Sequence, residues 1–442
     1  MEFIPDFGGF AFTLIAFIAA LSIIVAIHEY GHYIVGRWSG IHAEVFSLGF
    51  GPVLFSRVDR RGTKWQVAAL PFGGYVKFLG DSDAASGKNA AAIDALDVDE
   101  RRRSMHGAPL WARAATVAAG PVFNFILSIA IFASVLMIAG RPVEAPIVGT
   151  PAALPAEMVT LDEGDRILSI EGEPVETLAD VYTVARALEP TPTVDYIVER
   201  GGDEVAVTAS FPLLPIVQSV TPQSAAIAAG IEEGDVIQAI DGVAVHAFSQ
   251  LREAVDASAG DPLDLTVWRA GDTLDITLSP RRTDLPLVDG GFETRWLIGI
   301  AGGLIFDPVT ERVGPGSALM AGAEQTIFVI RSSLSGLWHM ITGAISSCNL
   351  QGPIGIAETS GAAASQGLDD FIWFIAVLST AVGLLNLFPI PVLDGGHLVF
   401  HAYEAVAGKP PSDKALRIFM TAGLTLLLSL MLFALTNDLF CP

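Results

Sequence analysis

Four long apolar runs divide the chain, and each predicts a helix that crosses a membrane. Residues 7–27, 114–139, 371–393 and 418–435 contain no charged side chain. At a rise of about 1.5 Å per residue, a run of about 20 residues spans the hydrocarbon core of a bilayer. We therefore expect a polytopic α-helical membrane protein with four transmembrane helices.

The segment between the first two runs has a pattern typical of strands. Residues 65–79, WQVAALPFGGYVKFL, are rich in alternating apolar positions and are interrupted by a proline and paired glycines. This pattern predicts a short hairpin or sheet, which we expect to be associated with the membrane. A polar loop over residues 81–100 then leads to the second apolar run.

An internal repeat lies between the second and third runs. The stretch EGDRILSIEGEPV at residues 163–175 recurs as EGDVIQAIDGVAV at residues 233–245. In each copy, apolar strands flank a Gly-Asp turn, and an amphipathic helix is predicted afterwards, at residues 178–188 and 248–257. The repeat is long enough to form a small domain of its own, so we expect two tandem α+β domains.

The repeated units resemble PDZ domains, most closely over residues 224–237 of the second copy. PDZ domains bind the C-terminal end of a peptide as an added strand beside a helix. The first copy departs from this pattern at residues 154–160, so its peptide groove is less well defined. Peptide binding and a role as spacers or size filters both stay open at this point.

The segment from residue 314 to residue 370 is neither clearly soluble nor clearly membrane-spanning. Within it, residues 332–357 lack charge but are rich in Ser, Gly and Thr. We expect helices that lie in the membrane interface or on the outside of the helix bundle, and no fifth span.

Composition supports an integral membrane protein and excludes one class of partner. The chain has 442 residues, of which 51% are hydrophobic, and its mean hydropathy is +0.52. A net charge of −23 argues against nucleic-acid binding, which requires a basic face. The two cysteines, Cys348 and Cys441, are too few for a disulfide framework; two free thiols are favoured, and a single disulfide stays open.

The basic residues predict the orientation in the membrane. Lysines occur only between the first and second runs and between the third and fourth, and an arginine triplet at residues 101–103 joins them. The positive-inside rule places these segments in the cytoplasm. Residues 141–311 contain no lysine and are acidic, which is typical of an exported region. Both termini therefore face outward. The lysines concerned are Lys64, Lys77, Lys88, Lys409 and Lys414.

The first candidate for chemistry is the sequence His28-Glu29-Tyr30-Gly31-His32, at the cytoplasmic end of the first run. On a helix, His28 and His32 project from one face and can bind one Zn²⁺, while Glu29 can accept a proton from the attacking water. Ionisable groups at membrane depth are costly and are usually functional. A lone asparagine in a span, Asn124, is more often a hydrogen-bonding residue of helix packing than a catalytic group.

We expect the third metal ligand at the end of the third run. Asp394 lies on the same side of the membrane as the two histidines, just after two prolines that interrupt the helix. A competing set exists, because His397 and His401 are also four residues apart, with Glu404 three residues further on. We prefer Asp394, because it completes a three-ligand site with an open fourth position.

Together, these motifs resemble the site-2 protease family of intramembrane zinc metalloproteases. The likeness rests on His-Glu-x-x-His in the first span, on two PDZ-like units between spans two and three, and on Asn-x-x-Pro-x-Pro-x-x-Asp-Gly at the end of span three. The resemblance implies zinc ligation by His28, His32 and Asp394, and catalysis by Glu29. It also implies that three further residues contact substrate, namely Asn386, Pro389 and Pro391.

The resemblance also implies a biological setting. It predicts cleavage of single-pass membrane proteins, such as anti-sigma factors already shortened by another protease, and of remnant signal peptides, in envelope stress signalling. It places the chain in a bacterial inner membrane, in contact with lipid, with the active site toward the cytoplasm and the PDZ-like domains in the periplasm. Two other classes compete with this reading, a metal transporter and a PDZ-bearing membrane scaffold.

These expectations divide the chain into nine segments. They are the first transmembrane helix (residues 1–37), a cytoplasmic-side β element and loop (38–113), the second transmembrane helix (114–140), PDZ-like domains (141–212 and 213–284), an exported-side linker with interfacial helices (285–370), the third transmembrane helix (371–397), a cytoplasmic loop (398–417) and the fourth transmembrane helix (418–437).

Overall fold

The computed structural model describes residues 7–81, 97–287 and 291–441. Most of the polar loop expected at residues 81–100 therefore lies outside the described residues. The chain forms two compact units. The first, called here the membrane unit, contains the chain up to Ser134 together with Gly316–Trp338 and Ser347–Cys441; the second, the repeat unit, contains Val135–Pro315 and His339–Ser346.

Four helices of the membrane unit are long and apolar enough to cross a bilayer, as the sequence predicted. The third of them ends at Asn386, before the apolar run does, because Pro389 and Pro391 cannot continue the helix. A new helix, α11 (Asp394–Ala407), begins a few residues later. The four helices are α1 (Phe7–Trp38), α4 (Leu110–Ala139), α10 (Leu368–Asn386) and α12 (Asp413–Phe440).

Small residues let these helices approach closely around α4. A Cβ atom added at Gly31 of α1 would lie 2.5 Å from the Ala119 carbonyl oxygen of α4. A Cβ atom added at Gly383 of α10 would lie 3.1 Å from the Pro121 carbonyl oxygen, also on α4. Close packing through glycine is typical of membrane helices, and here it brings α1 and α10 against the same helix.

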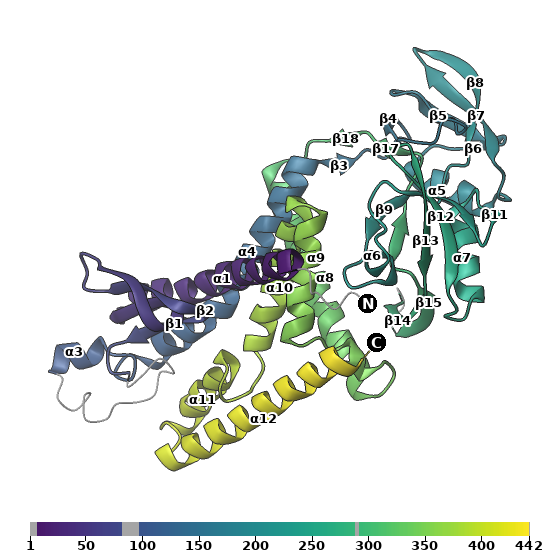
Figure 1. Ribbon diagram of the computed structural model, residues 1–442. Helices are drawn as coiled ribbons and strands as arrows, with labels where there is room; N and C mark the ends of the chain where they lie inside the picture. The colour runs from purple at the N-terminus through teal and green to yellow at the C-terminus, as the bar shows by residue number, and fades with distance from the viewer. Residues whose placement is uncertain (1–6, 82–96, 288–290, 442) are drawn as a thin grey trace. The chain divides into compact units, whose positions relative to one another are not determined.

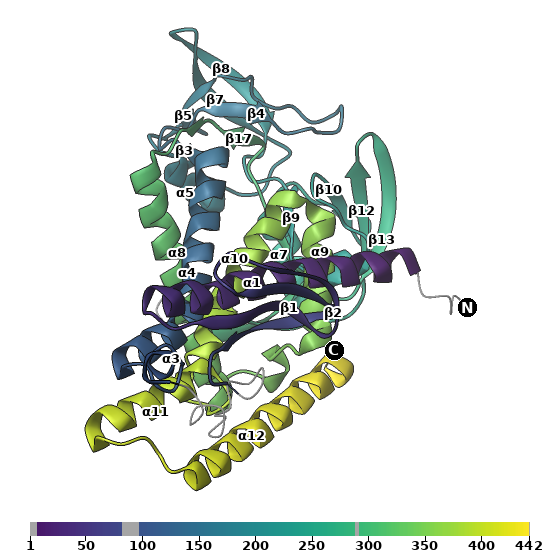
Figure 2. The same ribbon diagram turned by 90° about the vertical axis from the view of Figure 1, so that its left-hand side faces the viewer.

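The expected β element is an antiparallel pair, β1 (Ala43–Val58) and β2 (Lys64–Phe78). Residues 45–48 of β1 lie beside two parts of β2, 64–67 and 74–77. The pair lies alongside α1 in both views (Figures 1 and 2), and its core joins Tyr33 of α1 to Phe46 and Phe78. Its far half exposes apolar side chains, among them Leu54 and Phe55 at 72% and 66%, as expected for an element that contacts lipid. A short helix, α3 (Val98–Arg102), follows.

The segment after the repeats forms helices, and those before residue 368 are not among the four that are long and apolar enough to cross a bilayer. The helices are α8 (Pro315–Ile341), the 3₁₀ helix η1 (Ser347–Asn349) and α9 (Pro353–Gln366). Cys348 and Cys441 form a disulfide, so the favoured expectation of two free thiols was wrong. The disulfide joins η1 to the end of α12, and the Asp438 carboxylate beside it accepts hydrogen bonds from the Gly352 and Ile354 amides that begin α9.

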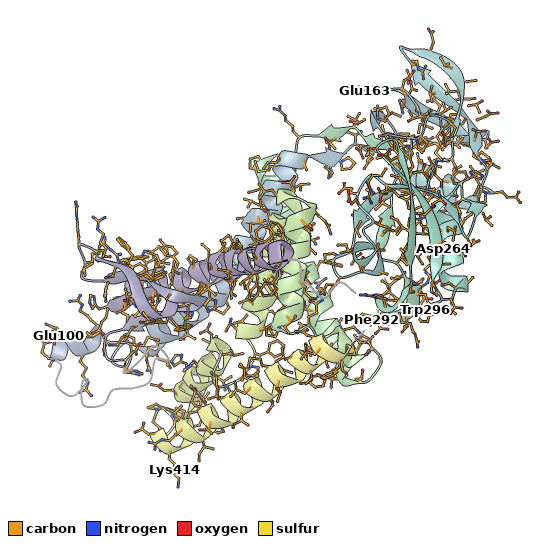
Figure 3. The ribbon with its side chains drawn as sticks, in the orientation of Figure 1. Glu100, Glu163, Asp264, Phe292, Trp296 and Lys414 are labelled. Atoms are coloured by element: carbon orange, nitrogen blue, oxygen red, sulfur yellow. A yellow bond between two sulfur atoms is a disulfide. The ribbon has the colours of Figure 1, made fainter. Side chains whose placement is uncertain are left out.

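Each copy of the internal repeat forms a four-stranded antiparallel sheet with a ten-residue helix, and the second copy has a short additional helix (Figure 1). Glu163, marked in Figure 3, begins the repeated stretch of the first copy, and Asp264 lies on a central strand of the second. The first copy has sheet order β6-β5-β7-β8 and the second β11-β10-β12-β13, so their topologies match. The elements of the first copy are β4 (Val148–Pro151), β5 (Arg166–Ile170), β6 (Glu173–Pro174), α5 (Leu178–Ala187), β7 (Thr193–Arg200) and β8 (Asp203–Ser210). Those of the second are β9 (Val217–Val220), α6 (Ala225–Ala228), β10 (Val236–Ile240), β11 (Val243–Ala244), α7 (Phe248–Ala257), β12 (Leu263–Arg269) and β13 (Asp272–Leu278).

The chain that leaves the second copy returns to the first. A hairpin of β14 (Arg281–Pro286) and β15 (Phe292–Leu297) is followed by three short strands. β16 (Ile300–Gly302) pairs with β9, β17 (Phe306–Pro308) with β4, and β18 (Thr310–Glu311) with β3 (Arg141–Pro142). Residues 300–302 therefore add a strand to the second copy, and residues 306–308 add one to the first. The domain boundaries expected at residues 212 and 284 stay predictions.

Candidate active site

The last turns of α1 place the two histidines on one face of the helix. Their Nε2 atoms lie 3.2 Å apart, and their side chains are only 12% and 13% exposed. The spacing of four residues, which the sequence provides, produces this arrangement on a helix. His28 and His32 thus converge as the sequence predicted.

Asp394 reaches the histidines from the opposite side of the site, at the first residue of α11. Its Oδ2 atom lies 3.2 Å from Nε2 of His28 and 3.5 Å from Nε2 of His32. The turn before it is tight: a Cβ atom at Gly395 would lie 2.3 Å from the Leu387 carbonyl oxygen. The glycine after Asp394 is therefore needed to fold the turn that delivers the carboxylate.

The three donor atoms fit one metal ion. They all lie within 4.8 Å of one another, and in a tetrahedral zinc site with bonds of about 2 Å the ligand atoms are roughly 3.3 Å apart. The buried Oδ2 atom of Asp394 has no hydrogen-bond partner among the described residues. A divalent cation would bind this carboxylate oxygen and the two imidazole nitrogens together, and these ligand types suit zinc.

Glu29 lies beside the cluster, between α1 and the β element. A Cβ atom at Gly74 of β2 would approach the Glu29 Cγ atom to 3.1 Å, and the Val76 backbone hydrogen-bonds the carboxylate. Gly74, Tyr75 and Val76 line the same cavity as Glu29. The carboxylate is therefore held next to the three converging donor atoms without being one of them.

A cavity of about 300 Å³ opens at this site. His397 and His401 line it, but neither belongs to the group of converging donors. Burial lowers the pKa of His397, and burial, followed by the nearby Arg113 guanidinium, lowers the pKa of His401 to about 4. Both shifts favour the neutral form of the ring. The competing ligand set is not assembled, because Glu404 instead forms a two-pronged ion pair with Arg113, with distances of 2.7 and 3.0 Å.

The three residues expected to contact substrate lie around the break between α10 and α11. Asn386 lines the cavity, and its amide donates to the Val382 carbonyl at 3.0 Å. Pro389 and Pro391 lie in the turn that follows, outside the cavity lining. A Cβ atom at Gly423 of α12 would come within 3.0 Å of Pro391. Substrate contact by these residues stays a prediction.

Sequence reasoning missed the contribution of α4 to the site. Thr116, Gly120 and Asn124 of α4 all touch the histidine rings, and Arg113 and His106, at or just before its start, line the cavity. The spacing of four between Thr116, Gly120 and Asn124 was a visible signal, because it puts them on one helix face. Which partner that face meets depends on the crossing of α1 and α4, which no local pattern specifies.

This arrangement defines a membrane-embedded metallohydrolase, with a group of three possible metal ligands and a neighbouring carboxylate. The two histidines and Glu29 are carried by a helix that can span a bilayer, and Asp394 begins the helix that follows the third such span. Comparison with known proteins agrees. The model of peptidase family M50 matches residues 16–430, and the chain therefore belongs to this family, that of the site-2 proteases.

Relatives cover almost the whole chain. A protein of Agrobacterium fabrum, named as a zinc metalloprotease, is 36% identical over 431 residues, which are 96% of this chain and 95% of the relative. A protein of Rhizobium meliloti with the same type of name is 36% identical over 433 residues, 97% of this chain and 96% of the relative. The regulator of sigma E protease of Salmonella typhimurium is 32% identical over 460 residues, 96% of this chain and 98% of the relative. The chain is a zinc metalloendopeptidase of the site-2 protease type, rather than a scaffold or transporter.

Proposed function

We propose that this protein hydrolyses peptide bonds inside the transmembrane segments of single-pass membrane proteins, with Glu29 as the catalytic base and with His28, His32 and Asp394 as the zinc ligands. The observation that carries the proposal is the convergence of these four side chains in one cavity, although Asp394 lies more than 360 residues from the others in sequence. Zinc, when bound, polarises the scissile carbonyl and makes water a stronger nucleophile.

The chain's own residues supply proton transfer and substrate positioning. Glu29 accepts the proton of the attacking water and passes it to the leaving amine. A transmembrane helix hides its carbonyls in its own hydrogen bonds, so the substrate must be extended before cleavage. The 74–77 part of β2 borders the cavity beside Glu29, and we propose that the substrate pairs with it as an added strand. Asn386 lines the same cavity, and we propose that it hydrogen-bonds the substrate backbone.

Glu29→Gln tests the assignment of the base. We expect the variant to keep stoichiometric zinc but to cleave a transmembrane peptide at least about 10²-fold more slowly, because the ligands stay and the base is lost. Cleavage is measured with purified protein in detergent, and zinc by elemental analysis of the same sample. Cleavage near the wild-type rate would remove Glu29 from the mechanism.

We further propose that the repeat unit lies in the periplasm and the active site toward the cytoplasm of a bacterial inner membrane. The distribution of lysines supports this orientation. The Cys348–Cys441 disulfide supports it independently, because it lies at the end of α12 opposite Lys414 and disulfides persist in oxidising compartments. Lys414, marked in Figure 3, is then on the cytoplasmic side.

In this orientation the PDZ-like repeats cannot take part in bond cleavage, and we propose that they control substrate entry. They exclude substrates with a bulky exported domain and admit those trimmed by an earlier cut, such as anti-sigma factors in envelope stress signalling or remnant signal peptides. A cavity of about 210 Å³ within the repeat unit is lined by residues of both copies, including Tyr182, Phe248, Arg186 and Arg252. Two guanidiniums beside aromatic rings suit the carboxylate at a newly cut C-terminus.

Removal of the repeats tests the gate. Residues 143–309 are replaced by a short Gly/Ser linker, which keeps β3 and β18, whose pairing brings the two cut ends together. We expect zinc binding and peptide cleavage to be unchanged, and an untrimmed substrate to be cleaved in cells. The control is the trimmed form of the same substrate, which both proteins should cleave. A deletion variant that still rejects the intact form would place the gate elsewhere.

A further inference from the structure

The second nitrogen of each metal-ligating histidine faces α4. Because the Nε2 atoms of His28 and His32 point at Asp394, each Nδ1 atom must carry the ring proton when a metal is bound, and that proton needs a buried acceptor. For His32 the acceptor is the Thr116 carbonyl oxygen, 2.8 Å from Nδ1. For His28 the neighbour is the side-chain amide of Asn124, at 3.3 Å.

The surface of α4 is shaped to hold these two rings. Gly120 lies midway between Thr116 and Asn124, one helical turn from each, and its missing side chain leaves room for both imidazoles. A Cβ atom there would lie 2.3 Å from Nε2 of His32 and 2.8 Å from Cε1 of His28. The Thr116 carbonyl, the space at Gly120 and the Asn124 side-chain amide thus follow one another along a single face of α4.

Asn124 is fully buried, and its two amide atoms are unequally placed. Nδ2, a donor, faces Nδ1 of His28, while Oδ1 has no hydrogen-bond partner among the described residues. A half-turn of the amide exchanges the two atoms and brings Oδ1 to His28, where it can accept the Nδ1 proton. The backbone carbonyl of Asn124 accepts bonds from Ser128 and Ser379, at 3.0 and 2.9 Å, so the residue is held on a fixed support.

We propose that Asn124 is a positioning residue for the metal site: its Oδ1 accepts the Nδ1 proton of His28 and thereby keeps the Nε2 lone pair directed at the metal, as the Thr116 carbonyl does for His32. The inference rests on the proposed metal role of the two histidines. It assigns to α4 the task of fixing the tautomer and orientation of both rings, which raises their affinity for zinc.

The test compares three variants of the full chain in detergent. Asn124→Leu has a similar volume but no acceptor, and we expect its zinc affinity, measured by competition with a chelator, to fall by about 10- to 100-fold. Asn124→Asp restores an acceptor and should bind zinc close to wild type. Ser134→Ala, which removes a hydrogen bond to the Ala130 carbonyl further along α4 and away from Asn124, should leave zinc affinity unchanged.

A second readout separates positioning from packing. The visible absorption bands of the Co²⁺-loaded protein report ligand geometry, and we expect them to shift in Asn124→Leu but not in Ser134→Ala. Wild-type zinc affinity in Asn124→Leu, or equal weakening in Asn124→Asp and Asn124→Leu, would overturn the proposal. Should Asn124→Leu fail to fold, Asn124→Ala takes its place. If the wild-type chain itself binds no stoichiometric zinc, the metal site fails, and the positioning role fails with it.

Discussion

Buried aspartates of the repeat unit have their carboxylates fully hydrogen-bonded, whereas the buried aspartate at the active site of the membrane unit does not. In the repeat unit, the carboxylates of Asp165 and Asp235 are fully buried. Arg200 donates two hydrogen bonds of 2.7 Å to Asp165. Arg269 donates two of the same length to Asp235. In the membrane unit, Asp394 faces two histidine nitrogens and keeps an oxygen without a hydrogen-bond partner. We call a carboxylate saturated when both of its oxygens have hydrogen-bond partners, and unsaturated when one has none. A buried saturated carboxylate has a structural role, whereas a buried unsaturated one is available for a ligand.

The same contrast extends to other buried groups. Among the described residues, the buried side-chain atoms that lack a hydrogen-bond partner all belong to the membrane unit, and four of the five residues concerned line or border the active-site cavity. The five are Asp81, His106, Asn124, Asp394 and His401. Two of these atoms, Asp81 Oδ1 and His106 Nε2, lie 3.3 Å apart and form an ion pair with each other. The other three belong to Asn124, Asp394 and His401 at the active site. Unsatisfied polar atoms in a buried place are costly, so these three mark the part of the molecule where stability is given up for function.

The largest expected effect comes from removing the unsaturated carboxylate. Asp394→Ala should lose stoichiometric zinc and, with it, all measurable cleavage, because two imidazoles alone do not complete the site. His397→Ala should keep the metal, because His397 lies in the same cavity but outside the ligand group. Both variants are assayed for zinc content and for cleavage of a transmembrane peptide. A zinc-loaded Asp394→Ala together with a metal-free His397→Ala would reverse our choice of third ligand.

Local patterns were sufficient for the helical half of the metal site. The four-residue spacing of His28 and His32 places both side chains on one face of any helix. The prolines before Asp394 predicted that the helix would be interrupted there. The internal repeat likewise predicted two similar α+β units, and both have the same strand order in the structure. In these cases the determining interactions lie within a few residues of one another.

Long-range pairings could not be predicted from the same patterns. The strands β16 and β17 complete the two repeats from about 80 and 155 residues away, and their short sequences carry no distinctive period. The Cys348–Cys441 disulfide has a sequence separation of 93, and its formation depends on where α12 ends relative to η1. The role of Asn124 depends on the crossing of α1 and α4. Each of these features is decided by tertiary packing rather than by propensity.

The smaller expected effect comes from breaking a saturated carboxylate. Asp235→Asn removes the negative charge to which two nitrogen atoms of Arg269 donate. The Arg269 side chain, which is 27% exposed, then lacks its main charged partner. Loss of one partner of a buried ion pair costs about 3–5 kcal/mol, and partial exposure of the arginine should bring this to about 2–4 kcal/mol. Limited proteolysis of the full chain along a urea series should show earlier cutting within residues 213–311, with zinc content and peptide cleavage unchanged.

The matched variant in the first repeat shows whether the contrast is general. Asp165 occupies the corresponding place, and Arg200 holds it with the same two distances. Because the Arg200 side chain is 39% exposed, Asp165→Asn should destabilise its own copy less than Asp235→Asn destabilises the second. If the clamps are structural, both variants retain full zinc and full cleavage of a short peptide. A loss of zinc in either variant would mean that the repeats contribute to the metal site, and that a saturated carboxylate does not by itself indicate a purely structural role.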